Sequence, residues 1–256
     1  MPRFDGPKVC LVTGGASGLG RATAVQLAAL GNPVAIGDLQ ESAGLETVAE
    51  IEADGGRAFF QHLDVTDRGS VKAFVDATVS RYGGLDCAVN NAGIEGPIQK
   101  LDAYADEDWR RVIEVNLVGV FTCMKHELAV MKDKGGSIVN VGSTGSLRGI
   151  GMMSAYIASK HGLAGLTKAA ALEYGAQGVR VNCLCPGGFR TPMSERLYGD
   201  DFSHILAGTP MARVAEADEI APAIVWLCSD ESTFVTGATH CVDGGRMAGP
   251  VPARRA

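Results

Sequence analysis

Short apolar runs alternate along the chain with longer amphipathic stretches. The short runs are β-branched or almost continuously apolar, which is typical of strands that are buried on both faces. They lie at residues 9–12, 33–36, 58–60, 85–89, 137–141, 179–184 and 238–242. The amphipathic stretches predict helices at residues 18–30, 41–54, 67–82, 106–132, 154–174 and 216–229.

Polar and glycine residues stand where several of these helices should begin and end. We expect Asp67 and Ser154 to be N-caps, and Gly31, Gly55 and Gly83 to follow the last residues of three helices. The alternation of strand and helix predicts βαβ units. The fold class is therefore α/β, with a doubly wound parallel sheet and helices on both faces.

The chain has no internal repeat, low-complexity segment or interdomain linker, so residues 1–256 are expected to form one domain. Only residues 186–214 break the rhythm, because they mix glycine, proline and apolar residues after a strand. Long loops in compact domains usually carry function, and we expect a substrate-binding lid at about residues 188–213. The composition of residues 246–256 predicts a terminal arm or a partly disordered tail.

Composition and charge exclude several classes of protein. Of the 256 residues, 46% are apolar and 20% are charged, which excludes a disordered chain. A net charge of −6 argues against nucleic acid or an anionic membrane as the partner. No run approaches the roughly 18 apolar residues of a membrane span, and no signal peptide is visible. A cytoplasmic protein is expected.

The seven cysteines also favour a reducing compartment. They are scattered and odd in number, which is unlike a disulfide framework. Cys183 and Cys185 are separated by one residue, and no second pair or nearby histidine completes a zinc set. No metal site is expected.

A glycine-rich turn leads from the first strand into the first helix. Gly14, Gly18 and Gly20 have the spacing Gly-x-x-x-Gly-x-Gly. Such a turn lets the backbone approach a pyrophosphate at the N-terminus of the helix. By itself it is also compatible with a plain tight turn.

Asp38 closes the second strand, 18 residues after Gly20. A carboxylate at this place can bind the hydroxyls of an adenosine ribose and repel a 2′-phosphate, whereas a solvated strand-end aspartate is the alternative. No Arg or Lys lies at residues 15–17 or 39–40, which favours NAD over NADP. Asp64 and Val65 end the third strand, where they can hold an adenine; Asp64 can equally cap a turn.

Further candidates for chemistry follow later strands. Asn90–Gly93 follows the fourth strand and Ser143 the fifth, and each can be structural. Tyr156 and Lys160 are four residues apart and therefore share one face of a helix. A cation close to a tyrosine lowers its pKa from about 10 toward neutrality. The combination predicts an acid/base site, although each element alone is common.

Together these motifs resemble the short-chain dehydrogenase/reductase family in order and spacing over residues 7–245. The motifs are Thr13–Gly20, Asn90–Gly93, Ser143, Tyr156-x-x-x-Lys160 and Pro186–Gly187. The resemblance implies a Rossmann-type, seven-stranded sheet, a nicotinamide cofactor and a homotetramer or homodimer.

The resemblance also implies roles for particular residues. Tyr156 is the expected general acid/base, Lys160 binds the nicotinamide ribose and lowers the pKa of Tyr156, and Ser143 binds the substrate oxygen. Asn116 resembles the family asparagine that holds a water in a proton relay. The expected cofactor-binding residues are Gly14, Ser17, Gly18, Leu19, Gly20, Asp38, Leu39, Asp64, Val65, Asn91, Ala92, Gly93, Tyr156, Lys160, Pro186, Gly187 and Thr191.

The sequence thus predicts hydride transfer between NAD(H) and a secondary alcohol or ketone, with a hydrophobic or cyclic substrate favoured. The pocket candidates, which can instead pack a lid or a subunit contact, are Ile94, Glu95, Ser146, Leu147, Ile150, Met152, Met153, Phe189, Met193, Leu197, Phe202 and Leu206. Two alternatives are an NADPH-dependent ketoacyl-type reductase and a non-catalytic NAD(H)-binding sensor or scaffold. Asp38 argues against the first, and the complete catalytic set argues against the second.

Overall fold

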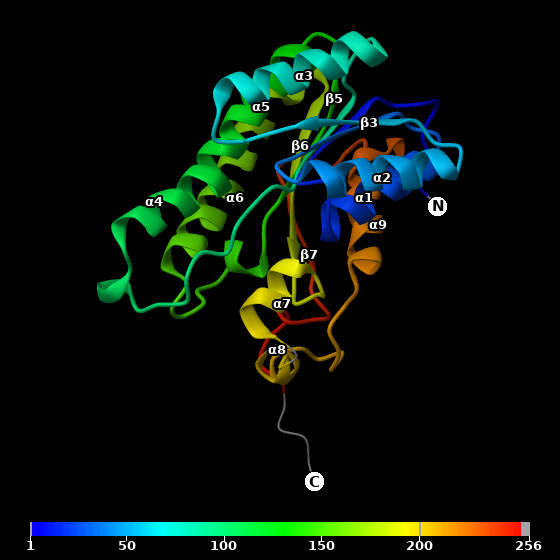
Figure 1. Cartoon of the computed structure of the whole chain (residues 1–256). Coiled ribbons are helices and arrows are strands. Elements are labelled where there is room, and N and C mark those ends of the chain that lie inside the picture. Colours follow the sequence, from blue (N-terminus) through cyan, green and yellow to red (C-terminus); the bar gives the residue numbers. More distant parts are fainter. Residues whose placement is uncertain (1, 200, 252–256) are drawn as a thin grey trace.

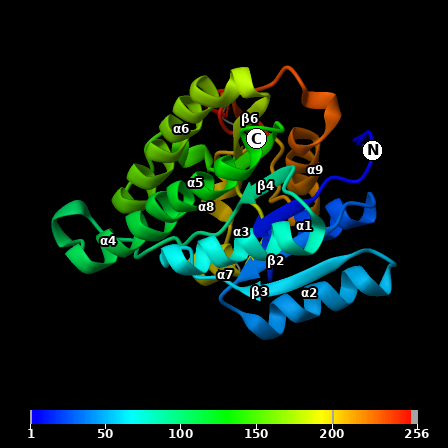
Figure 2. The same cartoon turned by 90° about the horizontal axis from the view of Figure 1, so that it is seen from above.

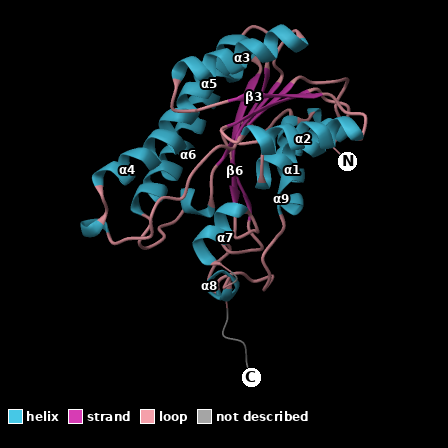
Figure 3. Cartoon of the chain, viewed as in Figure 1, coloured by secondary structure: helices cyan, strands magenta, loops and turns pink. Residues whose placement is uncertain are grey.

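A parallel sheet of seven strands forms the centre of the molecule (Figures 1 and 3). The computed structural model describes residues 2–199 and 201–251. The strands are β1 (Cys10–Thr13), β2 (Val34–Asp38), β3 (Ala58–His62), β4 (Cys87–Asn90), β5 (Gly136–Val141), β6 (Val179–Pro186) and β7 (Thr239–Val242). Their order is β3-β2-β1-β4-β5-β6-β7, which confirms the predicted doubly wound α/β class.

Helices cover both faces of the sheet. One face packs against α1 (Gly18–Ala29), α2 (Glu41–Ala53) and α9 (Ala217–Cys228). The other packs against α3 (Arg68–Tyr82), α5 (Val120–Met131) and α6 (Ser154–Tyr174). Figures 1 and 2 show α1 beside α9 and α3 beside α5. Apolar side chains fill both interfaces, as the continuous apolar runs predicted.

The long helix predicted at residues 106–132 is interrupted. It comprises α4 (Asp106–Ile113), a π-helical segment (Glu114–Gly119) and α5. The widened turn carries Asn116, whose side chain bonds the backbone of Ile94 rather than solvent. Single π-helical turns are frequent at functional sites.

The predicted helix ends are correct with one exception. The Asp67 side chain accepts a hydrogen bond from the Gly69 N–H and caps α3. Gly31, Gly55 and Gly83 end their helices with φ of 83°, 79° and 86°. The prediction for Ser154 is wrong, because it is the first residue of α6 and Met153 is the N-cap.

The segment predicted as a lid contains two short helices, α7 (Pro192–Tyr198) and α8 (Ser203–Ala207). A Cβ on Gly188 would lie 2.3 Å from the Ile205 Cγ2, so a glycine there lets α8 pack against the end of β6. Arg246 donates to the Ile205 carbonyl at 2.7 Å and ties the C-terminal segment to α8. Of the predicted tail, residues 252–256 lie outside the described residues.

Short 3-10 turns complete the described part: Leu101–Ala103, Thr144–Ser146, Gly175–Gln177 and Asp230–Ser232. Among the described helices, none has both the length and the apolar character needed to cross a bilayer. Thr13 of β1 pairs with Asn90 of β4 at the carboxyl edge of the sheet. The strand order reverses between these two strands, which is where open α/β sheets bind ligands.

Candidate active site

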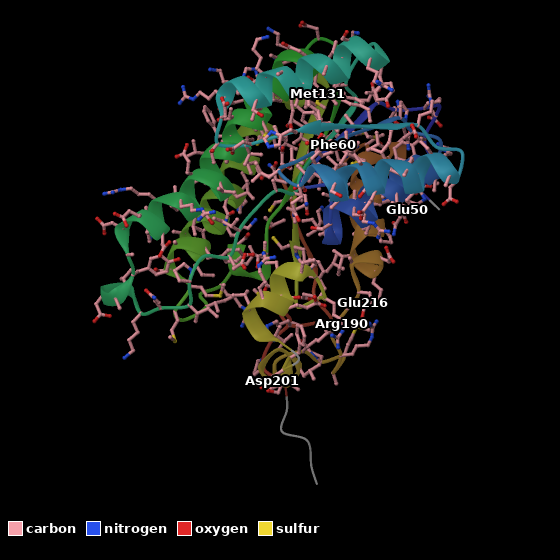
Figure 4. All side chains as sticks on the ribbon, viewed as in Figure 1. Glu50, Phe60, Met131, Arg190, Asp201 and Glu216 are labelled. Atoms are coloured by element: carbon pink, nitrogen blue, oxygen red, sulfur yellow. The ribbon has the colours of Figure 1, made fainter. Side chains whose placement is uncertain are left out.

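A cavity of about 560 Å³ opens at this reversal point. Its walls come from the carboxyl ends of six strands, β1 to β6, and from the loops that follow them, with α7 closing one side. Beside α7, Arg190 and Glu216 point toward each other, with 3.5 Å between Nε and Oε1 (Figure 4). The residues that line the cavity thus come from segments that are far apart in the sequence.

The glycine-rich turn forms the floor of the cavity at the start of α1. Gly14 and Gly18 have φ of 65° and 51°, which side chains rarely adopt. A Cβ on Gly20 would lie 2.0 Å from the Gly14 carbonyl oxygen, so only glycine fits there. Backbone N–H groups at a helix N-terminus, free of covering side chains, fit a pyrophosphate.

Asn91 holds the glycine-rich turn against the end of β4. Its Nδ2 donates to the carbonyl oxygens of Thr13 at 3.1 Å and Gly14 at 3.0 Å. The Thr13 hydroxyl in turn accepts from the N–H groups of Asn91 and Ala92. The Asn91 side chain therefore supports the turn, while Asn91 to Gly93 line the cavity.

Asp38 lies between the glycine-rich turn and the start of α2. Its Oδ2 accepts from the Ala16 N–H and its Oδ1 from the Gln40 N–H, both at 3.0 Å. These bonds fix a carboxylate on the cavity wall. Asp64 also lines the cavity, and its Oδ1 accepts from the Thr66 N–H and hydroxyl. Asp64 therefore caps a turn, and its contact with an adenine stays a prediction.

Lys160 is buried behind Tyr156. Its Nζ donates to the Val141 carbonyl at 2.7 Å and lies 5.7 Å from the centroid of the Tyr156 ring. Burial lowers the pKa of Lys160 to about 8, because an apolar environment disfavours the ammonium. The Tyr156 ring packs against Tyr104 and Val112 in a small apolar cluster.

Ser143 stands close to the same tyrosine. A Cβ on Gly145 would lie 3.3 Å from the Ser143 Oγ and 3.6 Å from the Tyr156 Cε1, so the two side chains lie close to each other beside Gly145. The Ser143 Oγ accepts from the Gly145 N–H at 3.0 Å. Ser146, a pocket candidate, is instead buried and accepts from the Ser143 N–H at 3.2 Å. It supports Ser143 and does not line the cavity.

Asn116 lies beneath the wall and is fully buried. Its Oδ1 accepts from the Ile94 N–H and its Nδ2 donates to the Ile94 carbonyl, both at 2.8 Å. A Cβ on Gly93 would lie 3.1 Å from this Oδ1 and 3.7 Å from the Lys160 Nζ. The structure thus brings Asn116, Ser143, Tyr156 and Lys160 to one end of the cavity.

The other candidates divide into two groups. The predicted cofactor-binding residues line the cavity, except Gly20, which supports the turn from below. The pocket candidates on the wall are Ile94, Glu95, Ile150, Met153, Phe189, Met193 and Leu197. Leu147, Met152 and Leu206 are exposed instead, and Phe202 is buried beneath the Arg190 guanidinium.

Some wall residues were not expected from the sequence. They include Arg111, Val115, Thr144, Arg246 and several backbone neighbours of the motifs. Arg196 of α7 was noted only as a neighbour in sequence, yet its Nε lies 3.2 Å from the Glu95 Oε1, across the cavity mouth. Val115 could have been found from the sequence, because it directly precedes Asn116. No sequence signal indicated the contact between Arg196 and Glu95, because the two residues are 101 positions apart.

Comparison with known proteins agrees with this geometry. Residues 14–246 match a family model described as "Enoyl-(Acyl carrier protein) reductase". Cis-4-hydroxycyclohexanecarboxylate dehydrogenase from Sinomonas cyclohexanicum is 45% identical over 94% of this chain and 97% of its own. Cyclohexanol dehydrogenase from Acinetobacter sp. (strain SE19) is 41% identical over 93% and 94%. The crystal structure of levodione reductase superimposes with a TM-score of 0.91 at 38% identity, covering 96% and 99%.

The strand order, the glycine-rich turn and the tyrosine–lysine pair define a dinucleotide-dependent dehydrogenase. Taken with the comparisons, they show that the chain belongs to the short-chain dehydrogenase/reductase family. It is an oxidoreductase that interconverts a secondary alcohol and a ketone, and its cofactor is a nicotinamide dinucleotide, which the open glycine cradle fits.

Proposed function

We propose that this enzyme transfers hydride between NAD(H) and a cyclic secondary alcohol or the corresponding ketone, with Tyr156 as the general acid/base. The observation that carries the proposal is the buried Lys160 ammonium, 5.7 Å from the Tyr156 ring at the end of the cavity that also holds Ser143. The names of two relatives, which refer to cyclohexanol and to a hydroxycyclohexanecarboxylate, support a ring-shaped substrate.

The residues divide the proton chemistry among them. With a pKa of about 8, Lys160 is mostly protonated at neutral pH, and its charge stabilises the Tyr156 phenolate. Tyr156 then takes the hydroxyl proton of the alcohol, while the Ser143 hydroxyl donates a hydrogen bond to the substrate oxygen. Asn116 holds the Ile94 backbone beside Lys160. The bound nicotinamide ring supplies the acceptor of the hydride.

Asp38 supports NAD as the cofactor. Its carboxylate is fixed by two backbone N–H groups at the end of β2, where an adenosine ribose would lie. A 2′-phosphate would meet this negative charge. The same charge disfavours an NADPH-dependent ketoacyl-type reductase, and the complete set of four catalytic residues disfavours a non-catalytic sensor.

The substrate would lie against the apolar part of the wall, near Ile94, Met153, Phe189 and Met193. The seven free cysteines, of which six are buried, support a reducing cytoplasm. Exposed apolar side chains on α5 and α6, such as Phe121 and Leu172, support assembly into a homodimer or homotetramer. Light scattering of the purified protein tests the assembly.

Turnover tests the proposal most directly. We expect NAD reduction with cyclohexanol-type alcohols and little reduction of NADP. Tyr156→Phe should reduce turnover at least about 100-fold while NADH fluorescence still reports binding. Preference for NADP would refute the role given to Asp38, and near-native turnover by the Phe variant would refute the role given to Tyr156.

A further inference from the structure

An arginine without a partner among the described residues lies in the wall of the cavity. Arg148 follows the 3-10 turn Thr144–Ser146, and it lines the cavity together with Ser143, Ile150 and Met153. These residues all belong to the segment that joins β5 to α6 and therefore to the end of the cavity that holds Tyr156. Arg148 thus borders the substrate, not the adenosine half of the cofactor.

The guanidinium of Arg148 has no counter-charge in the part of the chain that the structure describes. Its Nε is buried and has no hydrogen-bond partner among the described residues. Two arginines that follow β6 are paired, because Arg190 contacts Glu216 and Arg196 contacts Glu95. Within residues 2–199 and 201–251, no carboxylate pairs with Arg148. Arg148 as a whole is only partly buried, but a buried donor atom left unpaired is unfavourable, which suits a site that acquires its anion from a ligand.

Arg111 is a second arginine of the wall, and it lies on α4 just before the π-helical segment Glu114–Gly119. Arg148 differs from it because Arg148 lies on the same segment as Ser143. It also differs from Lys160, whose ammonium already donates to the Val141 carbonyl.

The backbone after Arg148 is strained in a way that fixes the loop. Met152 has φ of 65°, which is rare for a residue with a side chain. Its carbonyl accepts from the Gln99 N–H at 2.8 Å, so the strained turn is held against the loop that follows β4. Strained turns that are held by their surroundings cluster at ligand-binding sites.

We propose that the substrate is a cyclic secondary alcohol or ketone that carries a carboxylate, and that Arg148 binds this carboxylate. The planar guanidinium matches a carboxylate with two parallel hydrogen bonds. Ile150 and Met153, on the same segment, contact the ring between the carboxylate and the reacting oxygen. This inference rests on the proposed function, which supplies the ring and the position of the reacting carbon.

Matched pairs of substrates test whether Arg148 binds a substrate carboxylate. The native enzyme is assayed with NAD and with 3- and 4-hydroxycyclohexanecarboxylate, each beside its methyl ester, which has the same ring without the charge. We expect kcat/KM for an acid to exceed that for its ester at least about 10-fold. In Arg148→Met, kcat/KM for the acid should fall about 10- to 100-fold while the ester changes less than about 3-fold. For the acid, kcat/KM of Arg148→Lys should lie between the values of the native enzyme and Arg148→Met.

The controls separate charge recognition from damage to the fold. Arg110→Met, an exposed arginine of α4 paired with Asp106, should leave both rates unchanged. Equal losses for acid and ester in Arg148→Met would overturn the inference, and so would a native enzyme that does not distinguish them. In both cases turnover of the ester would still support the proposed function. Absence of turnover with all four compounds and either cofactor would overturn both proposals.

Discussion

Replacement of Glu127 by glutamine should make the protein more stable at neutral pH. Glu127 lies on α5 and is completely buried against the sheet. Its Oε2 accepts from the Asn90 Nδ2 at 3.0 Å, whereas its Oε1 has no partner among the described residues. Burial raises the pKa of this carboxyl to about 8, although the bond from Asn90 opposes the shift.

The size of the effect follows from proton linkage. The folded protein keeps the Glu127 proton up to about pH 8, whereas the unfolded chain releases it near pH 4.5. Between these values the unfolded state binds fewer protons, so the free energy of unfolding falls as the pH rises. At about 1.36 kcal/mol for each pH unit, the loss reaches about 3 kcal/mol by pH 7. Below pH 4.5 this loss is absent.

Urea unfolding at pH 5, 6, 7 and 8, at one fixed protein concentration, measures this slope. Glutamine keeps the shape of the side chain and does not titrate, so Glu127→Gln should match the native protein near pH 5 and exceed it at pH 8. The exposed Glu46→Gln on α2 serves as the control and should follow the native slope. If Glu127→Gln retained the native slope, the buried carboxyl would not be the cause.

Three further substitutions probe the cofactor and catalytic ends. Gly20→Ala places a methyl group 2.0 Å from the Gly14 carbonyl oxygen and should abolish NADH binding, which a fluorescence titration measures. Gly84→Ala is the control: no atom lies within 4 Å of its new methyl group, and NADH binding should be unchanged. Asp38→Asn should raise kcat/KM with NADP at least about 10-fold, because a charge repulsion is removed; an unchanged ratio of NAD to NADP would refute this. Lys160→Met should lower turnover at pH 7 about 100-fold and shift the activity to higher pH, since the ammonium that stabilises the phenolate would be lost; an unshifted pH profile would contradict the role of Lys160.

The sequence was most informative where burial or chemistry leaves a local pattern. Strands buried on both faces require continuous apolar residues, which located β1, β2, β4, β5 and β6 within a few residues of their ends. The apolar runs also located the edge strands β3 and β7, although these are only partly buried. Parallel strands end at one edge of the sheet, so motifs placed after strands had to share a site. This reasoning predicted that Gly14, Asp38, Asn91 and Ser143 share a site, and all four line the cavity. Tyr156 was placed there by the family resemblance.

Only the tertiary structure decided what depends on distant partners. Asn116 lies in a π-helical segment, and its amide bonds the Ile94 backbone, 22 residues away. Of the apolar lid residues, Met193 and Leu197 face the cavity while Leu206 faces solvent, and their spacing did not reveal this. Whether Arg148 is paired depends likewise on where the carboxylates of distant segments lie, and among the described residues none reaches it. The sequence by itself thus determined the strands and most helix ends, because these follow from local spacing, and through the family resemblance it predicted the reactive groups. The tertiary structure decided which side chains meet across the cavity, because that depends on packing between segments far apart in the chain.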